Sequence, residues 1–495
     1  MSDLIDKVYR FCTGEDLLKF DGVIVGLSGG PDSVALIKTF IELRSRGLYN
    51  GDIRAVHINH NMRPGDCDRD EEFVRNLCRD LDIPLVCESF DIIKMAKEDG
   101  RTEEEEGRIV RYRVFEQYKS KLLNEGLGTY AIAVAHHGDD LAETFMMNLF
   151  RGSGLEGLRG IKPRSGDIIR PFLCVTKKDI LEFLGDDPYC IDNTNSELNS
   201  TRNIWRNKIL PQISEVSIKE PEEAIRDTSA LLASDLEFIS GETYRAFDDC
   251  KVEMDGFVML DCTKAAGLHK AILSRVIRHL FLYAAGSLKD FETVNLNIAL
   301  DMVKGEDDAP GRADMPFGIT GFRVGALFGF VRQEDLMPVM RTIADALGFV
   351  TASPDMNIVI TPEQAEVGFA SEMPDSLYKI NISIIENYED LEYNNKSWFC
   401  PISDITGNIS VHGCLGASQF FKAGSSGSKQ VRRIYTDLKV PREIRDEIIG
   451  ISDGEDILFI PGIGHSKGFV SPRSKELCAP CGRLLEIRFE ERRSK

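Results

Sequence analysis

The chain has 495 residues, and because single hydrophobic cores stop growing near about 250 to 300 residues, we expect two or three domains. Its 42% hydrophobic and 28% charged residues are typical of a soluble globular protein, and no run of about 18 apolar residues is present to span a membrane. The formal net charge of -20 excludes a uniformly basic nucleic-acid-binding protein. Any RNA site must therefore be a local basic patch.

The first residues and the cysteines bear on the cellular compartment. The start, Met1 to Asp6, carries acidic residues early and has no Arg-rich or long apolar run, so no targeting signal is evident. The 12 cysteines are scattered, and at this chain length they do not describe a disulfide scaffold. We expect reduced thiols and a cytoplasmic protein.

Short apolar runs alternate with helical patterns in the first part of the chain. The strand candidates are residues 23–27, 53–58, 84–88 and 131–135, and the helix candidates between and after them are 34–43, 70–81 and 108–122. Repeated strand–helix units predict an α/β domain, residues 1–212, with a doubly wound, mainly parallel sheet. Its ligand should lie at the carboxyl ends of the strands.

The pattern changes twice beyond this domain. Segments 224–239 and 271–283 have apolar residues at helical spacing, which predicts a mainly helical middle domain, residues 213–334. Short β-rich runs such as 357–360 and 457–460 then predict a small α+β C-terminal domain, residues 335–495. Segment 351–395 gives weak signals of both kinds and is left unassigned.

A Gly-rich loop follows the first strand candidate and opens a helix. A pyrophosphate is suited by what this loop offers: glycines that leave room, free N–H groups, hydroxyls and a helix dipole. The candidate ATP site is therefore Ser28, Gly29, Gly30, Pro31, Asp32 and Ser33. No lysine follows the glycines as in the Walker pattern, which favours cleavage between the α and β phosphates. Asp32 is suited to holding Mg²⁺. The alternative is a turn that only caps a helix.

Two further groups have spacings that suit the same cleft. Arg108 and Arg111 are three apart on a predicted helix and would contact phosphate or acidic groups, unless they form surface ion pairs. Asp139, Asp140 and Glu143 follow a strand candidate and can share one helix face at the carboxyl edge of the sheet. Such carboxylates can bind Mg²⁺ or an ammonium group, and the alternative is a solvated helix start.

The ordered strings carry a family resemblance. The loop at 28–33 resembles the PP-loop ATP pyrophosphatase superfamily, and His137 to Thr144, with Arg151-Gly152-Ser153-Gly154 after it, closely resembles the signature of the tRNA(Ile)-lysidine synthetase family. The strings 57–64, 105–112, 169–172, 192–195 and 201–207 agree with that family in order and spacing. Leu141 stands where the family commonly has glutamine.

The resemblance implies a function. ATP would adenylate the wobble cytidine of tRNA(Ile) with anticodon CAU, and L-lysine would then replace AMP to form lysidine, so that the tRNA reads AUA instead of AUG and is charged with isoleucine instead of methionine. Asp32, Asp139, Asp140 and Glu143 would be catalytic, with Mg²⁺ on Asp32 and Asp139. Arg63 would contact substrate or phosphate, as would Arg108 and Arg111. Arg202 and Arg206, four apart on a presumed helix, form a basic stripe that can grip RNA, with ordinary helix charge balance as the alternative.

The C-terminal segment resembles the tRNA-contacting domain of that family. Its basic residues include the expected tRNA contacts Lys429, Arg432, Arg433 and Arg442. Residues 415–418, Leu-Gly-Ala-Ser, replace the usual Arg-Pro-Gly-Asp and lack both charges. Cys478 and Cys481 have the spacing of half a zinc site, but no second pair follows.

Two other readings stay open. A PP-loop tRNA thiolase would need reactive or cluster-binding cysteines near the loop, and Cys67, Cys78 and Cys87 are not paired in that way. A noncatalytic tRNA-binding relative would not need the acidic residues. The expected partners are the tRNA and L-lysine with no membrane, and a homodimer is left open.

Overall fold

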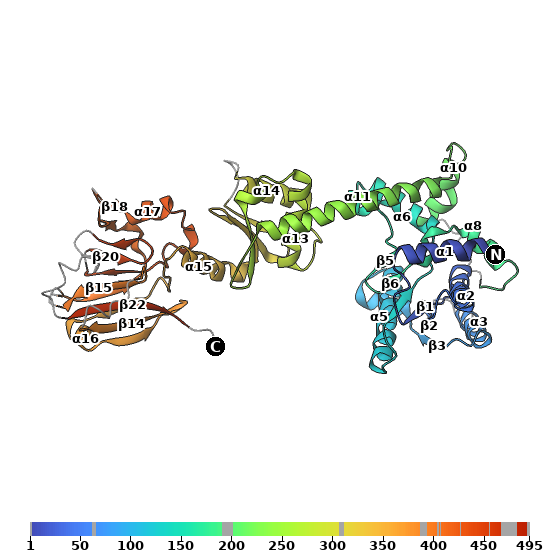
Figure 1. The fold of residues 1–495 in the computed structure, drawn as a ribbon, viewed down its shortest axis with the longest axis horizontal. Helices are drawn as coiled ribbons and strands as arrows, with labels where there is room; N and C mark the ends of the chain where they lie inside the picture. The colour runs from blue at the N-terminus through green and yellow to red at the C-terminus, as the bar shows by residue number, and fades with distance from the viewer. Residues whose placement is uncertain are drawn as a thin grey trace. The chain divides into compact units, whose positions relative to one another are not determined.

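The computed structural model describes residues 2–61, 66–190, 201–305, 311–386, 394–402, 405, 407–425, 427–454, 456–466 and 483–492. Arg63, the string 192–195, Cys478 and Cys481 lie outside the described residues. The chain divides into two compact units, Met1–Phe238 and Ile239–Lys495 (Figure 1). None of the described helices combines the length and the apolar character needed to cross a membrane.

The first unit is built on a six-stranded sheet in the order β3-β2-β1-β4-β6-β5. Its strands are β1 Gly22–Gly26, β2 Asp52–Asn59, β3 Leu85–Ser89, β4 Tyr130–Ala133, β5 Arg164–Ser165 and β6 Ile168–Ile169. All neighbouring pairs are parallel except β5 with β6. The prediction of a mainly parallel sheet is confirmed.

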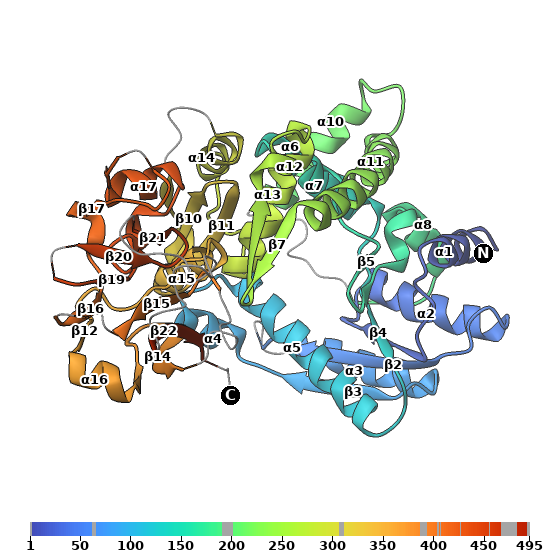
Figure 2. The same ribbon diagram turned by 60° about the vertical axis from the view of Figure 1, so that its left-hand side comes forward.

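Helices cover both faces of this sheet (Figure 2). The helices of this unit are α1 Ser2–Gly14, α2 Pro31–Ser45, α3 Asp66–Asp80, α4 Ile92–Asp99, α5 Glu103–Asn124, α6 Gly138–Phe150, α7 Leu155–Leu158, α8 Lys177–Leu184, α9 Thr201–Ile204 and α10 Leu210–Ser214, with a 3-10 turn η1 Pro171–Cys174 and a π turn η3 Trp205–Ile209. Val23 and Val25 of β1 pack with α1, α2, α3 and α8, whereas Ile24 packs with α4 and α5. Alternate side chains of one strand thus enter two cores, which makes the fold doubly wound.

The strand order places two loops at one edge. β1 lies between β2 and β4 and is parallel to both, and chain progression reverses direction there. In open α/β sheets this switch point opens a crevice at the carboxyl ends of the strands. The loop after β1 holds residues 28–33, and the loop after β4 leads into α6.

The long helix α11, Pro221–Cys250, contains the division between the units and leads into an antiparallel sheet in the order β7-β8-β11-β10-β9. Its strands are β7 Lys251–Met254, β8 Phe257–Asp261, β9 Arg312–Met315, β10 Ile319–Val324 and β11 Leu327–Arg332, and the further helices are α12 Cys262–Ala265, α13 Lys270–Ala285 and α14 Thr293–Lys304, with 3-10 turns η4 Pro316–Gly318 and η5 Gln333–Asp335. Leu273 and Ile277 of α13 pack on Phe328 and Phe330 of β11. The predicted helices of 213–334 are present, but sequence pattern did not predict this sheet.

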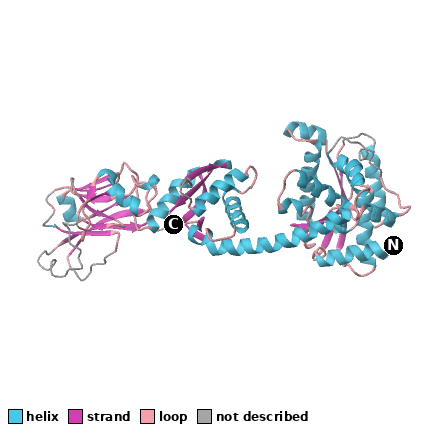
Figure 3. Ribbon diagram, turned by 90° about the horizontal axis from the view of Figure 1, so that it is seen from above, coloured by secondary structure: helices cyan, strands magenta, loops and turns pink. Residues whose placement is uncertain are grey.

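Two sheets face each other in the C-terminal part of the second unit (Figure 3). One has the order β12-β16-β19-β20-β21 and the other β13-β14-β22-β15, and a hairpin β17-β18 adds a third. The strands are β12 Asn357–Ile360, β13 Phe369–Glu372, β14 Tyr378–Ile385, β15 Ser397–Pro401, β16 Ile409–His412, β17 Gln419–Phe420, β18 Lys429–Gln430, β19 Gly450–Ser452, β20 Ile457–Ile460, β21 Gly464–His465 and β22 Leu484–Glu491. The helices are α15 Leu336–Ala346, α16 Pro362–Val367 and α17 Val431–Asp437, with 3-10 turns η8 Leu415–Ala417 and η9 Arg442–Ile444. The predicted α+β character is confirmed.

One apolar core crosses the boundary expected between residues 334 and 335. Met259 and Phe322 of the five-stranded sheet pack in the same cluster as Val339 of α15 and Tyr435 of α17. The division into domains at residue 334 therefore stays a prediction.

Candidate active site

The pyrophosphate loop is held in a tight turn between β1 and α2. Ser33 donates from Oγ to the Gly30 carbonyl oxygen at 3.0 Å, and the Ser28 and Ser33 hydroxyls lie 3.2 Å apart. Pro31 is the first residue of α2, where its missing N–H has no intrahelical acceptor to lose. The first N–H groups of α2 lack intrahelical partners, and with the helix dipole they form an anion site.

Gly29 is required by the shape of this turn. Its φ of +89° lies in the left-handed region, where a side chain costs about 1–2 kcal/mol. A Cβ at this position would also lie 3.1 Å from the Cys190 sulfur. The Cys190 N–H donates to the Gly29 carbonyl oxygen at 2.9 Å. Any residue larger than glycine would therefore disturb both the turn and its packing.

The acidic cluster begins at the first turn of α6. His137 is the N-cap, and its backbone N–H donates to Asp140 Oδ2 at 3.0 Å. Gly138 allows a close approach, because its N–H donates to the Val175 carbonyl oxygen at 2.8 Å and a Cβ there would lie only 3.0 Å from that oxygen. This contact brings the start of α8 to the start of α6.

Lys177 at the start of α8 bridges the loop and the cluster. Its ammonium donates to Asp32 Oδ1 at 2.5 Å, and its backbone N–H donates to Asp139 Oδ2 at 3.2 Å. The other Asp139 oxygen, Oδ1, is buried without a hydrogen-bond partner. Lys177 was not among the residues predicted from sequence, since 145 residues separate it from Asp32 and only the tertiary fold joins them.

Glu143 accepts from two arginines at the inner end of the cluster. Its side chain is fully buried, and its two carboxylate oxygens accept from Arg202 Nε at 2.6 Å and Arg206 Nε at 2.5 Å. The same guanidinium groups donate to Asp140 Oδ1 at 3.3 and 3.0 Å. The predicted basic stripe is thus engaged by the predicted carboxylates. We call Asp140, Glu143, Arg202 and Arg206 the arginine clamp.

The charges of the cluster shift the pKa of its members. Burial alone would raise the pKa of Asp140, but His137 and Arg202 bring it below its usual range. Burial would lower the pKa of His137, but Asp139 at 3.8 Å and Asp140 at 3.6 Å raise it. Burial lowers the pKa of His136 to about 4, so His136 is neutral at pH 7.

One more acidic residue belongs to this neighbourhood and was missed by sequence reasoning. Burial raises the pKa of Glu222, in the first turn of α11, and the charges of Asp139, Glu220 and Glu143 add to the effect. Glu222 lies about 80 positions beyond the His137–Thr144 string, so no spacing rule connects the two.

Two protein-family models match this sequence. Residues 4–213 match the family model described as a PP-loop domain, and residues 410–479 match the model described as the TilS substrate C-terminal domain. A tRNA(Ile)-lysidine synthase of Clostridium tetani is 30% identical over 480 residues, covering 95% of each chain. The chain belongs to the tRNA(Ile)-lysidine synthase family. Another relative of that name, from Caldanaerobacter subterraneus, is 29% identical and covers 94% of each chain. A third, from Bacteroides thetaiotaomicron, is 40% identical over 43% of this chain and 48% of its own length.

Within this tRNA(Ile)-lysidine synthase family member, the predicted phosphate contacts lie on α5. Arg108 and Arg111 are exposed, and neither forms an ion pair with a described residue. Arg108 stacks over the Tyr112 ring at 5.1 Å. Arg170 is buried, its Nε has no hydrogen-bond partner, and the charge of Arg108 helps to lower its pKa after the larger effect of burial. These arginines form a cationic group without a counter-ion among the residues described.

The His-rich turn before Arg63 has a packing role. His57 is buried, and its Nδ1 lies 2.8 Å from the carbonyl oxygen of Leu27, directly before the pyrophosphate loop. Burial, with the charge of Arg111, lowers the pKa of His60 to about 4. His57 therefore packs against the loop, and His60 is neutral at pH 7.

The predicted tRNA contacts of the second unit lie on and beside α17. Arg432, Arg433 and Arg442 are exposed and have no ion-pair partner in the described part of the chain, whereas Lys429 pairs with Asp437. Burial, then Arg442 and Arg432, lower the pKa of Arg445, which shows that these cations gather. Three of the four predicted residues thus remain free for an anion.

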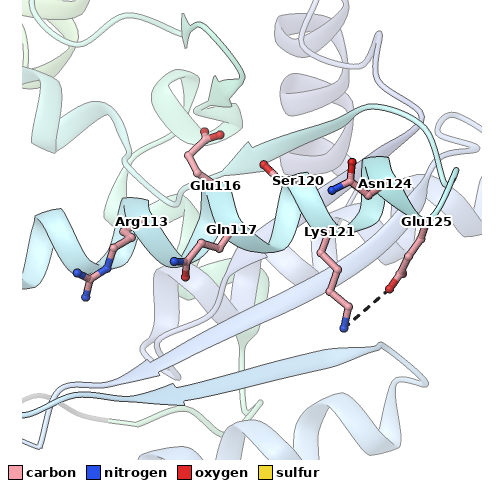
Figure 4. A pocket seen from close by; sticks show the side chains of 7 residues that line it. All are labelled: Arg113, Glu116, Gln117, Ser120, Lys121, Asn124 and Glu125. Atoms are coloured by element: carbon pink, nitrogen blue, oxygen red, sulfur yellow. Dashed lines mark ion pairs between the residues drawn. The ribbon is translucent and has the colours of Figure 1, made fainter.

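A shallow surface depression of about 680 Å³ lies along α5 (Figure 4). Its lining residues come from that one helix and its C-cap: Arg113, Glu116, Gln117, Ser120, Lys121, Asn124 and Glu125. Lys121 and Glu125 form an ion pair across 3.9 Å. No residue of the pyrophosphate loop or the acidic cluster lines this depression, so it is not the ATP site.

Proposed function

We infer that this protein uses ATP to join L-lysine to the wobble cytidine of tRNA(Ile) with anticodon CAU, forming lysidine. Family membership over the full chain gives the reaction class. The structural observation that supports this function is that Lys177 links Asp32 of the pyrophosphate loop to Asp139 of the acidic cluster at the switch point of the sheet. The nucleotide and the amine substrate would meet at this edge.

In the first step, the carbonyl oxygen of the cytidine would attack the α-phosphate of ATP. An oxygen–phosphorus bond forms to the cytidine, and pyrophosphate leaves. The N–H groups at the start of α2, with the hydroxyls of Ser28 and Ser33, would hold the leaving pyrophosphate. Arg108 and Arg111, which have no counter-ion among the described residues, would offset further phosphate charge.

The donor set fits Mg²⁺. Asp32 and Asp139 offer hard carboxylate oxygens, and Asp139 Oδ1 is buried without a partner. Magnesium is usually held by one or two carboxylates together with substrate phosphates, which matches these two residues beside a pyrophosphate loop. When bound, the ion would neutralise charge on the pyrophosphate. The Lys177 ammonium would leave Asp32 as the ion arrives.

In the second step, the lysine side-chain amine would attack the activated carbon of the base and expel AMP. In the described site, the carboxylates of Asp32, Asp139, Asp140 and Glu143 face three cationic side chains, Lys177, Arg202 and Arg206. A carboxylate cluster of this kind can hold the ammonium group of the substrate lysine. A carboxylate of the cluster would take the proton that the amine loses.

The product would read AUA instead of AUG and be charged with isoleucine instead of methionine. The basic group on α17 would contact the body of the tRNA through phosphates. A local patch of this kind resolves the conflict between RNA binding and a net charge of -20.

A tRNA thiolase is the weaker alternative. Burial raises the pKa of Cys78 and of Cys190 to about 12, so these thiols near the loop are protonated at pH 7. Within the described ranges, no group of three or more His, Cys, Asp or Glu side chains could hold a metal ion. A noncatalytic relative is disfavoured because the loop and all four carboxylates are in place together.

Incubation of the full chain with the unmodified tRNA(Ile), ATP and labelled lysine tests the function. Mass analysis of the nucleosides should show lysine attached to cytidine, with AMP formed in equal amount. The matched control is the same tRNA with uridine at the wobble position, which should remain unmodified. Absence of lysine from the cytidine would refute the proposed function, and sulfur incorporation would favour the thiolase.

A further inference from the structure

Two aromatic rings lie together beside the arginine clamp and are not used by the chemistry above. Phe150 is the last residue of α6 and is 72% exposed, and Trp205 is the first residue of the π turn η3. Their ring centroids are 5.3 Å apart, with the planes inclined by 31°. The two residues are 55 positions apart in the chain, so the tertiary fold brings the rings together.

The position of this pair relative to the acidic cluster follows from helix geometry. Phe150 is seven residues after Glu143 on α6, which is nearly two turns, so both lie on the same face about 10 Å apart along the axis. Trp205 directly precedes Arg206, whose Nε is 2.5 Å from Glu143. The aromatic pair therefore borders the arginine clamp.

Two cationic residues lie close to the pair in the sequence. Arg151 directly follows Phe150, and Lys208 lies one turn after Trp205. Both side chains are exposed, and neither has an ion-pair partner among the residues that the structure describes. Phe150 is exposed and Trp205 is half-buried. Accessible aromatic rings beside unpaired cations can bind unpaired nucleotides, the rings by stacking and the cations by phosphate contacts.

We propose that Phe150 and Trp205 form a stacking platform for an unpaired anticodon-loop base adjacent to the target cytidine. This proposal rests on the proposed function for the identity of the RNA. Stacking would hold the loop open and direct the cytidine toward the pyrophosphate loop, with Arg151 and Lys208 contacting the flanking phosphates. The platform thereby positions the substrate and takes no part in bond making.

The full chain offers a direct probe, because it contains two tryptophans and the other, Trp398, is fully buried in the second unit. In a Trp398→Phe background, addition of an anticodon stem-loop RNA should quench the Trp205 emission at saturating RNA. Absence of quenching, with RNA binding shown by a labelled RNA, would overturn the platform.

Kinetics give the second readout. Phe150→Ala and Trp205→Ala should raise the KM for tRNA about 5- to 150-fold, the range expected for loss of one stacked base, and leave the KM for ATP and lysine unchanged. Trp205→Phe should rescue the KM to within about threefold, since it keeps a stacking ring. Phe238→Ala is the matched control, because Phe238 is 70% exposed on α11 and is not in the platform.

The outcomes separate this proposal from the proposed function. Unchanged KM for tRNA in both alanine variants, while the wild type forms lysidine, would overturn the platform and leave the function intact. Quenching and KM effects with no lysine in the product would refute the function and support an RNA-binding platform. Trp205→Ala could instead change the oligomeric state, measured by sedimentation, and leave the RNA affinity unchanged. That result would overturn the proposal and show that the aromatic pair contacts a second copy of the chain.

Discussion

The arginine clamp distinguishes two roles for Arg206, and Arg206→Gln tests them. As part of a basic stripe, Arg206 would bind tRNA phosphate, whereas in the structure it donates to Glu143 at 2.5 Å and to Asp140 at 3.0 Å. The substitution leaves the fully buried Glu143 with Arg202 as its remaining charged partner. The structure therefore predicts effects on stability and on the chemical steps, and little effect on phosphate binding.

The expected loss of stability follows from the hydrogen bonds removed. A hydrogen bond to a charged group contributes about 1.5–3 kcal/mol, and Arg206 donates two. Its side chain is 35% exposed, and solvent screening reduces the sum, so we expect the free energy of unfolding of the first unit to fall by about 2–3 kcal/mol. Urea unfolding followed by the emission of Trp205, in the Trp398→Phe background, measures this value.

The salt dependence of tRNA binding decides between the roles. Loss of one phosphate contact lowers the slope of log affinity against log salt by about 0.7–0.9, which changes the wild-type to variant affinity ratio roughly threefold between 50 and 200 mM salt. Arg206→Gln should leave the slope unchanged and slow lysidine formation about 100-fold, because displaced carboxylates no longer hold the substrates in reacting geometry. Arg432→Gln, on the exposed patch of α17, is the control that should lower the slope.

A slope lowered by about 0.7–0.9 in Arg206→Gln, with the unfolding free energy unchanged, would refute the clamp and restore the basic-stripe interpretation. Equal slopes for Arg432→Gln and the wild type would instead remove Arg432 from the proposed tRNA surface. The two variants share one assay, so a general fault in binding conditions would affect both.

Four further predictions use other residues of the first unit. Asp32→Ala should abolish AMP formation, measured by product chromatography, because the loop loses its carboxylate beside the pyrophosphate; unchanged activity would remove Asp32 from the site. Lys177→Met should shift the Mg²⁺ requirement to lower concentration, since the cation competing for Asp32 is gone, and an unaltered Mg²⁺ titration would contradict that competition. Gly29→Ala should lower the thermal midpoint and raise the KM for ATP at least tenfold, because φ is +89° there, and wild-type kinetics would show that the turn tolerates a Cβ. Burial lowers the pKa of His60 and His136 to about 4, below their unfolded value near 6.5, so the unfolded chain binds these protons first. The stability contributed by the two neutral histidines should therefore be complete above pH 6.5 and be lost as the pH falls through 4, by at most about 3 kcal/mol per histidine. Unfolding measured from pH 7 to 4 tests this, and His136→Asn should reduce the slope of the unfolding free energy against pH.

The fold of the first unit could be predicted from sequence because its signals are local. The strand expected at 53–58 is β2, Asp52–Asn59, and the helix expected at 108–122 is α5, Glu103–Asn124. The central strands β1 and β4 are almost fully buried, so each appears in the sequence as a continuous apolar run. The sheet of β7 to β11 was missed because its strands are four to six residues long and are separated by helices α12 to α14.

The unassigned segment 351–395 shows a different limit. β14, Tyr378–Ile385, alternates in burial as a strand should, but it pairs with β22, Leu484–Glu491, about 100 residues later. No local pattern identifies such a partner, and a strand without its partner resembles an irregular segment.

In the site, sequence reasoning predicted the members but not their partners. Asp140 and Glu143 were expected to share a helix face, and they do, because the i, i+3 rule is a property of one helix. Their pairing with Arg202 and Arg206 joins segments about 60 residues apart and depends on the tertiary fold. The contact of Lys177 with Asp32 also depends on the tertiary fold. Sequence reasoning therefore did not single out Lys177, because lysine is common on protein surfaces.

These partners offset the negative charge of the four carboxylates that lie together. Without them, mutual repulsion would raise the pKa of at least one, as it does when two carboxylates share a site. Here the pKa of Asp140 is lowered, through His137 and Arg202, despite its burial. The arginines are anchored on the buried Glu143, whereas Lys177 is about one-third exposed on a flexible side chain. The clamp is therefore the permanent part of the charge balance, and Lys177 is the part that an incoming cation can replace.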